Sequence, residues 1–167
     1  TTYYQFNTDK FLSDNFLYYI LSSDTTRKIV QQVKKLDQIE SDYKLLRKYN
    51  IPDYSLKYLI KDYKIEMLEK IKENVFILND YYVPFPIIDE FAREELNLNL
   101  MNKERIVNGI LYVLINNEKD GNTFMYLNSC LETSTELLNI SVEKINEIIS
   151  ENLKLEYDSE FVLDENK

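Results

Sequence analysis

Residues that interrupt a helix are scarce in this chain. Its 167 residues include two glycines and three prolines, the two residue types least compatible with a helix interior. Apolar residues recur with a spacing close to 3.6 through much of the sequence, and this spacing predicts a mainly α-helical fold of short amphipathic helices. The clearest groups are Ile29, Val30, Val33, Leu36; Leu45, Leu46, Tyr49; Leu56, Leu59, Ile60, Tyr63; and Met67, Leu68, Ile71.

Polar residues that favour helix N-termini mark where these helices should begin. Asp24 or Thr25 can cap the first, and Ser41 or Asp42 can cap the second. Asp53 can cap a third, which follows the proline-containing turn "NIPDYS". We therefore expect three separate helices between residues 24 and 63.

The second half of the chain begins with a stiff turn, Val83-Pro84-Phe85-Pro86, followed by a new helical stripe. Asn102 can cap a long helix that is apolar on most sides and should therefore be central. Helices are also expected from Tyr126 to Leu138 and after Ser141. Alternating apolar residues from Leu153 onward predict a β-hairpin, and two helices with a hairpin give a winged-helix outline.

Composition argues against a membrane protein and against a nucleotide-binding enzyme. The longest apolar run, "ILYVLI", is far shorter than a membrane span. The patterns G-x-x-x-x-G-K-[ST] and G-x-G-x-x-G are absent, and the lack of histidine excludes Ser-His-Asp and Cys-His sites. A calcium-loop-like stretch, "NNEKDGNTFMYL", has Leu127 where the bidentate glutamate should stand. We expect no catalytic residue, no metal and no cofactor.

The single cysteine, Cys130, is expected to be a small buried group in a reducing compartment. No N-terminal basic region leads into an apolar one, so the sequence favours a soluble, cytoplasmic protein. Because the chain starts at Thr1, we expect it to be part of a longer protein.

Charge is unevenly distributed along the sequence. The net charge is −9, yet residues 25–72 hold 12 Lys/Arg against 7 Asp/Glu, and residues 73–167 hold 7 against 19. One basic segment therefore lies within an acidic protein. Only that segment has the cations needed to neutralise nucleic-acid phosphates.

The stretch "RIVNGILYVLINNEKDGNT", residues 105–123, resembles a segment of RecD-like DNA helicases (the exodeoxyribonuclease V alpha-type, RecD/TraA family), of the longer type that acts without the other two exonuclease V subunits. That family has a helix of the form R-I-x-x-G-I-x-Y-x-L, an acidic stretch and a G-H-T turn. The likeness extends over about residues 16–162. Matching residues are Arg105, Ile106, Gly109, Ile110, Tyr112, Leu114, Gly121 and Thr123, with Asn122 in place of histidine, and upstream Asn50, Ile51, Asn74, Phe76, Leu78, Val83, Phe85 and Asp89.

The resemblance implies tandem helix-hairpin-helix modules in residues 1–100, followed by a long helix and a winged-helix-like module in residues 101–167. The degenerate hairpin would consist of Tyr82, Val83, Pro84 and Phe85, with Tyr82 and Pro84 at the family's glycine positions. Proline has no N–H, so phosphate binding should be lost there while the turn survives. A fainter copy, "ILSSDTTRKIV", would place Ile20 and Ser22 at the glycine positions.

The family places these modules before an ATPase core, and nothing in this sequence matches that core. The resemblance therefore implies a non-catalytic accessory region of a DNA repair and recombination helicase. Its role would be to position single-stranded or forked DNA, or other repair proteins, against a motor core in cis. Candidate phosphate contacts are Arg27, Lys28, Lys34 and Lys35.

Two other functions remain open from sequence. The tyrosine-rich surface, which includes Tyr54 and Tyr58, could bind protein instead of DNA. Alternatively, the chain could be a stand-alone winged-helix regulator. The recognition helix "SVEKINEIISENLK" argues against this regulator because it would bring Glu143, Glu147 and Glu151 to the DNA.

Overall fold

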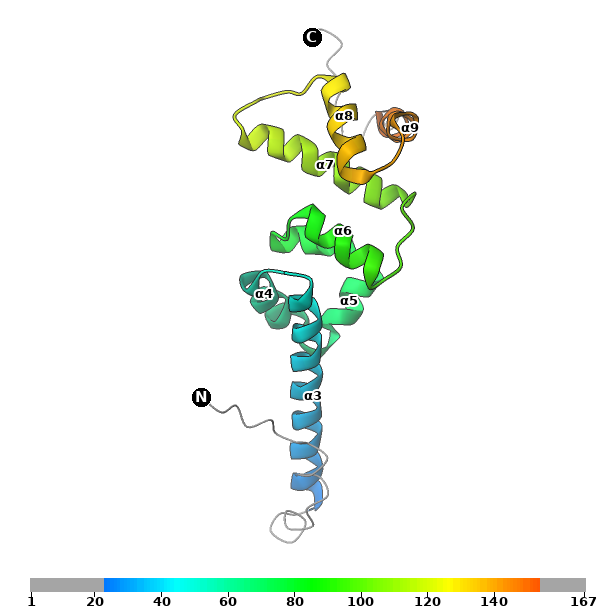
Figure 1. The fold of residues 1–167 in the computed structure, drawn as a ribbon. Coiled ribbons are helices and arrows are strands. Elements are labelled where there is room, and N and C mark those ends of the chain that lie inside the picture. The colour runs from blue at the N-terminus through cyan, green and yellow to red at the C-terminus, as the bar shows by residue number, and fades with distance from the viewer. Residues whose placement is uncertain (1–22, 154–167) are drawn as a thin grey trace. The chain divides into compact units, whose positions relative to one another are not determined.

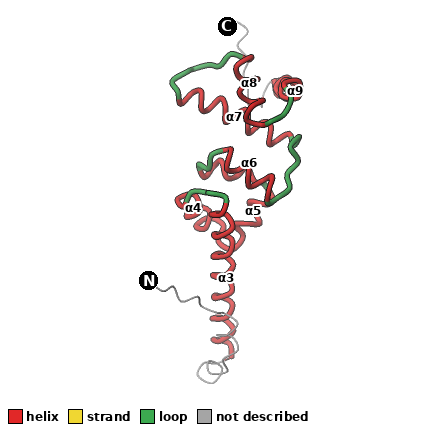
Figure 2. Tube along the Cα trace, viewed as in Figure 1, coloured by secondary structure: helices red, strands yellow, loops and turns green. Residues whose placement is uncertain are grey.

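A computed structural model describes residues 23–153, and every regular element in that range is helical (Figures 1 and 2). The predicted mainly α-helical fold is confirmed. The elements are α3 (Ser23–Lys48), α4 (Asp53–Tyr63), η1 (Lys64–Glu66), α5 (Met67–Glu73), η2 (Val75–Tyr81), α6 (Phe85–Glu94), α7 (Lys103–Lys119), α8 (Leu127–Leu138) and α9 (Val142–Leu153).

The chain divides into two compact units, unit 1 at residues 1–70 and unit 2 at residues 71–167. The division falls within α5. The boundary predicted at residues 100 and 101 lies inside unit 2, where α6 packs against α7.

Helix α3 of unit 1 corrects the prediction of two short helices. Ser41 and Asp42, expected as caps, lie inside this 26-residue helix. Asp42 is 2% exposed, and its carboxylate accepts a hydrogen bond from Gln38 Nε2 at 2.7 Å. No Gly or Pro stops the helix, and the Lys44–Glu40 ion pair at 2.6 Å spans the expected break.

Unit 1 packs α4 and η1 against α3. The buried part of α3 lies towards its C-terminal end, where Figure 1 shows α4 beside it. Asp53 does not cap α4, because Pro52 occupies the N-cap. The Asp53 carboxylate instead accepts a hydrogen bond from the Tyr43 hydroxyl at 2.9 Å, and this bond raises the pKa of Tyr43. Core residues in this unit are Leu46, Tyr49, Ile51, Leu56, Leu59 and Met67.

Unit 2 is organised around α7, as the sequence predicts. This helix contacts η2, α6, α8 and α9, and Asn102 caps it by accepting a hydrogen bond from the Arg105 N–H at 2.9 Å. Asn139 ends α8 in the left-handed conformation, with φ 53° and ψ 48°. The apolar core residues that are 0% exposed are Ile71, Leu78, Ile88, Phe91, Ala92, Ile106, Leu138 and Ile145.

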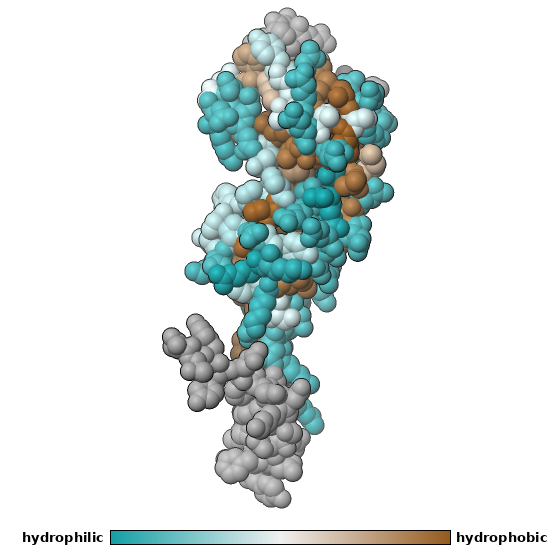
Figure 3. Space-filling model, in the orientation of Figure 1, coloured by the Kyte–Doolittle hydropathy of each residue, from teal (hydrophilic) through white to brown (hydrophobic). Residues whose placement is uncertain are grey.

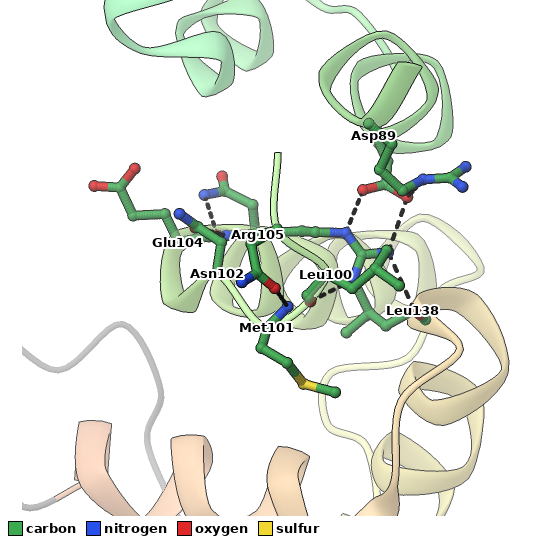
Figure 4. A network of polar contacts seen from close by, with 10 residues as sticks. Asp89, Leu100, Met101, Asn102, Glu104, Arg105 and Leu138 are labelled. Atoms are coloured by element: carbon green, nitrogen blue, oxygen red, sulfur yellow. Dashed lines mark hydrogen bonds and ion pairs between the residues drawn. The ribbon is translucent and has the colours of Figure 1, made fainter. Parts of the chain in front are cut away.

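A buried ion pair crosses this core (Figure 4). Arg105, 2% exposed, donates from Nε to Asp89 Oδ1 at 2.5 Å and from Nη2 to Asp89 Oδ2 at 3.0 Å. Its guanidinium also donates to the carbonyls of Leu100, at 2.9 Å, and Leu138, at 3.1 Å. The carbonyl of Leu138 marks the end of α8, so one side chain joins α6, α7 and α8.

The chain ends carry two predictions that the structure does not test. The predicted C-terminal β-hairpin would begin at Leu153, which here ends α9, and its other residues lie outside the described range. The winged-helix module therefore stays a prediction, as does the hairpin at Ile20 and Ser22. None of the helices in residues 23–153 has the length and apolar character needed to cross a membrane.

Candidate nucleic-acid interface

The hairpin between η2 and α6 lies where the sequence predicts it. Tyr82 has the left-handed conformation, with φ 60° and ψ 29°, that glycine adopts most easily. Its N–H donates to the Asn79 carbonyl at 3.0 Å, and the Val83 N–H donates to the Leu78 carbonyl at 3.2 Å. These two bonds and the buried Val83–Leu78 pair form a Schellman motif. The motif fixes a tight turn without glycine.

The N-terminus of α6 has few amides to offer a phosphate. Pro84 is the N-cap, with φ −61° and ψ 138°, and Pro86 lies in the first turn. Neither residue has an N–H. The N–H groups of Ile87 and Ile88 both donate to the Pro84 carbonyl. In this first turn, the N–H of Phe85 is therefore the one that could reach a phosphate. The structure therefore shows that this hairpin keeps a tight turn, while Pro84 and Pro86 remove two N–H groups from the start of α6. Loss of phosphate binding here stays a prediction.

A second hairpin of the same geometry joins α3 to α4. Asn50 has φ 60°, and its N–H donates to the Arg47 carbonyl at 3.0 Å, while the Ile51 N–H donates to the Leu46 carbonyl at 3.4 Å. Pro52 is the next N-cap, with φ −60° and ψ 140°. The sequence signal was present, since "NIP" and "YVP" each place a β-branched residue between a turn residue and a proline.

This first hairpin is also poorly suited to phosphate. Asp53 is the first residue of α4, and its carboxylate lies at the helix terminus where an anion would otherwise bind. Arg47 Nε approaches the same carboxylate at 3.5 Å. The local cation is therefore already paired with an internal acid.

The predicted phosphate contacts share one side of α3. Arg27 and Lys34, and likewise Lys28 and Lys35, are seven residues apart, so the four side chains lie within about 120° around the helix. All four are exposed, and Lys28 forms an ion pair with Asp24 at 3.1 Å. Helix α3 contains seven basic and four acidic residues. We call these four residues the cationic strip.

Unit 2 has a groove of 1420 Å³ between the Tyr82 hairpin, η2 and α7. A hydrogen bond from Asn79 Nδ2 to Asn108 Oδ1 at 2.7 Å crosses between its two sides. Residues 71–153 hold 6 Lys/Arg and 14 Asp/Glu, so the surrounding field repels nucleic acid. Figure 3 shows hydrophobic side chains reaching the surface of this unit. The apolar lining residues include Phe76, Tyr82, Val107, Leu111, Tyr112 and Ile115.

Two helical pairs, each joined by a left-handed residue, a buried β-branched residue and a proline, define a helix-hairpin-helix protein. Residues 35–124 match the family model of the ATP-dependent RecD2 DNA helicase HHH domain. The match covers more than half of the chain, and the chain belongs to this family. Comparisons with curated proteins and with solved structures found no match.

Two residues of the family-like helix have structural roles here. Arg105 holds the buried network described above. Gly109 allows α7 and α8 to approach closely, because a Cβ at this position would lie 2.5 Å from Leu138 Cδ2. Both residues of α7 thus contact Leu138 at the end of α8.

Proposed function

We propose that this chain is a non-catalytic, DNA-contacting region of a RecD2-type helicase. The cationic strip of α3 would bind DNA phosphates without reading sequence, and the two hairpins would act as rigid turns. The observation that carries the proposal is the contrast between the cationic strip and the two hairpins. Four exposed cations lie on one side of α3, whereas both hairpins have proline in place of an amide donor.

The proposed contacts are electrostatic and therefore depend strongly on salt. Each phosphate neutralised contributes a slope of about −0.9 on duplex and about −0.7 on single strands to log K against log salt. Four contacts give a slope of about −3. Solvent-exposed cations of this kind give modest affinity, which suits a region that positions DNA while a motor acts on it.

The test is fluorescence anisotropy with single-stranded, duplex and forked DNA over a range of KCl concentrations. The variant R27Q/K28Q/K34Q/K35Q removes the cationic strip. The matched control, K72Q/K103Q/K119Q/K144Q, removes four cations from unit 2. The first variant should lose most of the affinity and the salt slope, and the second should keep both. Absence of DNA binding at 25 mM KCl, or a wild-type slope in the first variant, would refute the proposal.

In the whole helicase, this region would hold single-stranded or forked DNA near an ATPase core in cis during repair or recombination. We expect this role to be carried out in the cytoplasm. We expect the isolated chain to hydrolyse no ATP. A sequence-reading role for α9 is disfavoured, because this helix carries Glu143, Glu147 and Glu151 against Lys144.

One observation favours a second function for unit 2, namely docking of protein. The groove beside α7 combines apolar residues with a net negative unit, which suits a basic segment of the motor core. Ile115 is 47% exposed at this groove. Replacing Ile115 with Glu should weaken binding of a separately expressed motor core, measured by calorimetry, and leave DNA affinity unchanged. Equal binding by both proteins would exclude this docking site.

A further inference from the structure

The exposed face of α4 carries aromatic and cationic side chains together. Tyr54, Lys57, Tyr58 and Lys61 follow the spacing i, i+3, i+4, i+7, so they lie within about 100° around the helix. Tyr54 is 50% exposed and Tyr58 is 54% exposed, and both lysines are exposed. The opposite face of α4, with Ser55, Leu56 and Leu59, is buried. These tyrosines are therefore on the surface and outside the core.

We propose that this α4 face binds unpaired bases of single-stranded DNA, an inference that rests on the proposed DNA-contacting function. Tyr54 and Tyr58 are one helical turn apart, about 5.4 Å along the axis, which lets two neighbouring bases stack on them. Lys57 and Lys61 lie between and beside the rings and bind the phosphates of the same strand. Stacking platforms with nearby cations are how sequence-tolerant single-strand binding is achieved.

Charge and composition favour a nucleic acid over a protein on this face. Residues 23–70 hold 11 Lys/Arg and 8 Asp/Glu, so unit 1 is net positive where unit 2 is net negative. Two acidic residues, Asp53 and Asp62, flank the face. The Asp53 carboxylate already accepts a hydrogen bond from the Tyr43 hydroxyl and lies near Arg47. Lysine is depleted from the cores of protein interfaces, and here two lysines lie among the tyrosines.

The face should also discriminate between single strands and duplex. Bases in a duplex already stack on each other and present no free ring surface to a side chain. The cationic strip of α3, by contrast, needs only phosphates and accepts both forms. The two surfaces of unit 1 would thus divide the work, with α3 supplying affinity and α4 supplying preference for unpaired DNA.

The experiment measures anisotropy of three probes with the full chain: a dT12 strand, an abasic 12-mer and a 12-base-pair duplex. The test variant is Y54L/Y58L, in which leucine keeps helix propensity but removes the ring face. The matched control is F124L/Y126L, which removes two aromatic rings of unit 2 that are 46% and 65% exposed. A second variant, Y54F/Y58F, keeps the rings without hydroxyls.

Y54L/Y58L should bind dT12 about 30-fold more weakly, the low end for two stacked bases, and should bind the abasic strand as wild type does. The control and Y54F/Y58F should bind dT12 with an affinity within about twofold of wild type, a change much smaller than the loss of stacking would cause. K57Q/K61Q should weaken binding of dT12 and of the abasic strand equally. It should also reduce the magnitude of the salt slope by about 1.4. Circular dichroism confirms that each variant is folded.

A direct reporter is available because the protein has no tryptophan. In Y58W, the single indole should be quenched by dT12 and not by the abasic strand or the duplex. Equal dT12 affinity of Y54L/Y58L and wild type, with a salt slope that depends on α3, would overturn this inference and leave the proposed function intact. No binding to any probe would overturn both.

Discussion

Replacing Arg105 with methionine should unfold unit 2 at a much lower denaturant concentration. The side chain is 2% exposed and makes two hydrogen bonds to Asp89 and two to main-chain carbonyls. Methionine fills part of the volume and supplies none of these donors. A carboxylate that is 8% exposed then remains in the core.

The expected loss follows from that uncompensated carboxylate. Breaking one side of a buried ion pair costs about 3–5 kcal/mol, and two carbonyls that lose their donor add to this cost. Arg93 reduces it, because its Nε stays bonded to Asp89 Oδ2 at 3.0 Å while its own side chain is 44% exposed. We therefore expect a loss of about 3 kcal/mol in the free energy of unfolding. This is a large fraction of the roughly 5–15 kcal/mol of a whole domain.

The assay is urea denaturation followed by far-ultraviolet circular dichroism, with the accessibility of Cys130 as a probe of unit 2. The matched control is Lys103→Met, two residues away on α7, whose ion pair with Glu151 at 3.0 Å is exposed. That variant should lose less than about 1 kcal/mol. In the double variant D89L/R105M both charges are removed, and most of the stability should return.

Two results would contradict this reasoning. A loss below about 1 kcal/mol in R105M would mean that the pair behaves as a solvated surface bridge. Failure of D89L/R105M to recover any stability would mean that the carbonyl bonds, and not the orphaned carboxylate, account for the loss.

Three further outcomes can be checked. Tyr82→Gly should raise the free energy of unfolding by about 0.5–1 kcal/mol. Removing the side chain from a left-handed backbone position gains about 1–2 kcal/mol, and the greater backbone entropy of glycine costs about 0.5–1 kcal/mol. Tyr82→Ala, measured in the same melts, should give no gain. Burial raises the pKa of the Cys130 thiol, so iodoacetamide at pH 8 should modify it slowly in the native protein and rapidly in urea, and fast native labelling would disprove its burial. Hydrogen bonds from its own backbone N–H and from Ser141 lower the pKa of Glu143, so its contribution to stability is present above the unfolded value near 4.3 and is lost as pH falls through the folded value. The difference in melting temperature between wild type and Glu143→Gln should therefore shrink as acid is added, and a difference that grows would contradict that sign.

Much of the fold could be predicted because the signals are local. The cap of α7 by Asn102, the end of α8 at Leu138 and the start of α6 after Pro84 each depend on residues a few positions apart. The sequence predicted a helix boundary at Ser41 and Asp42, because both residue types favour helix N-caps, but α3 continues through them. Burial of Asp42 and its bond from Gln38 allowed the helix to continue, and burial is a property of the folded unit.

The candidate site was predictable only in part. Arg27, Lys28, Lys34 and Lys35 could be placed on one helix side by counting. The shared pattern of "NIP" and "YVP" hinted that the hairpins at Asn50 and Tyr82 are equivalent, but backbone angles were needed to show it. Asparagine adopts the left-handed conformation readily, whereas tyrosine does not.

Amino-acid order alone determined that this chain is helical, that it bears one basic segment in an acidic whole, and that it has neither a glycine-rich phosphate loop nor histidine chemistry. These properties follow from composition and short-range spacing, which need no fold. Tertiary packing decided which charged side chains are buried in ion pairs and which remain exposed to solvent. Arg105 and Lys103 are near neighbours of like charge on one helix, and only the approach of α6 and α8 buries the first beside Asp89 and leaves the second in water.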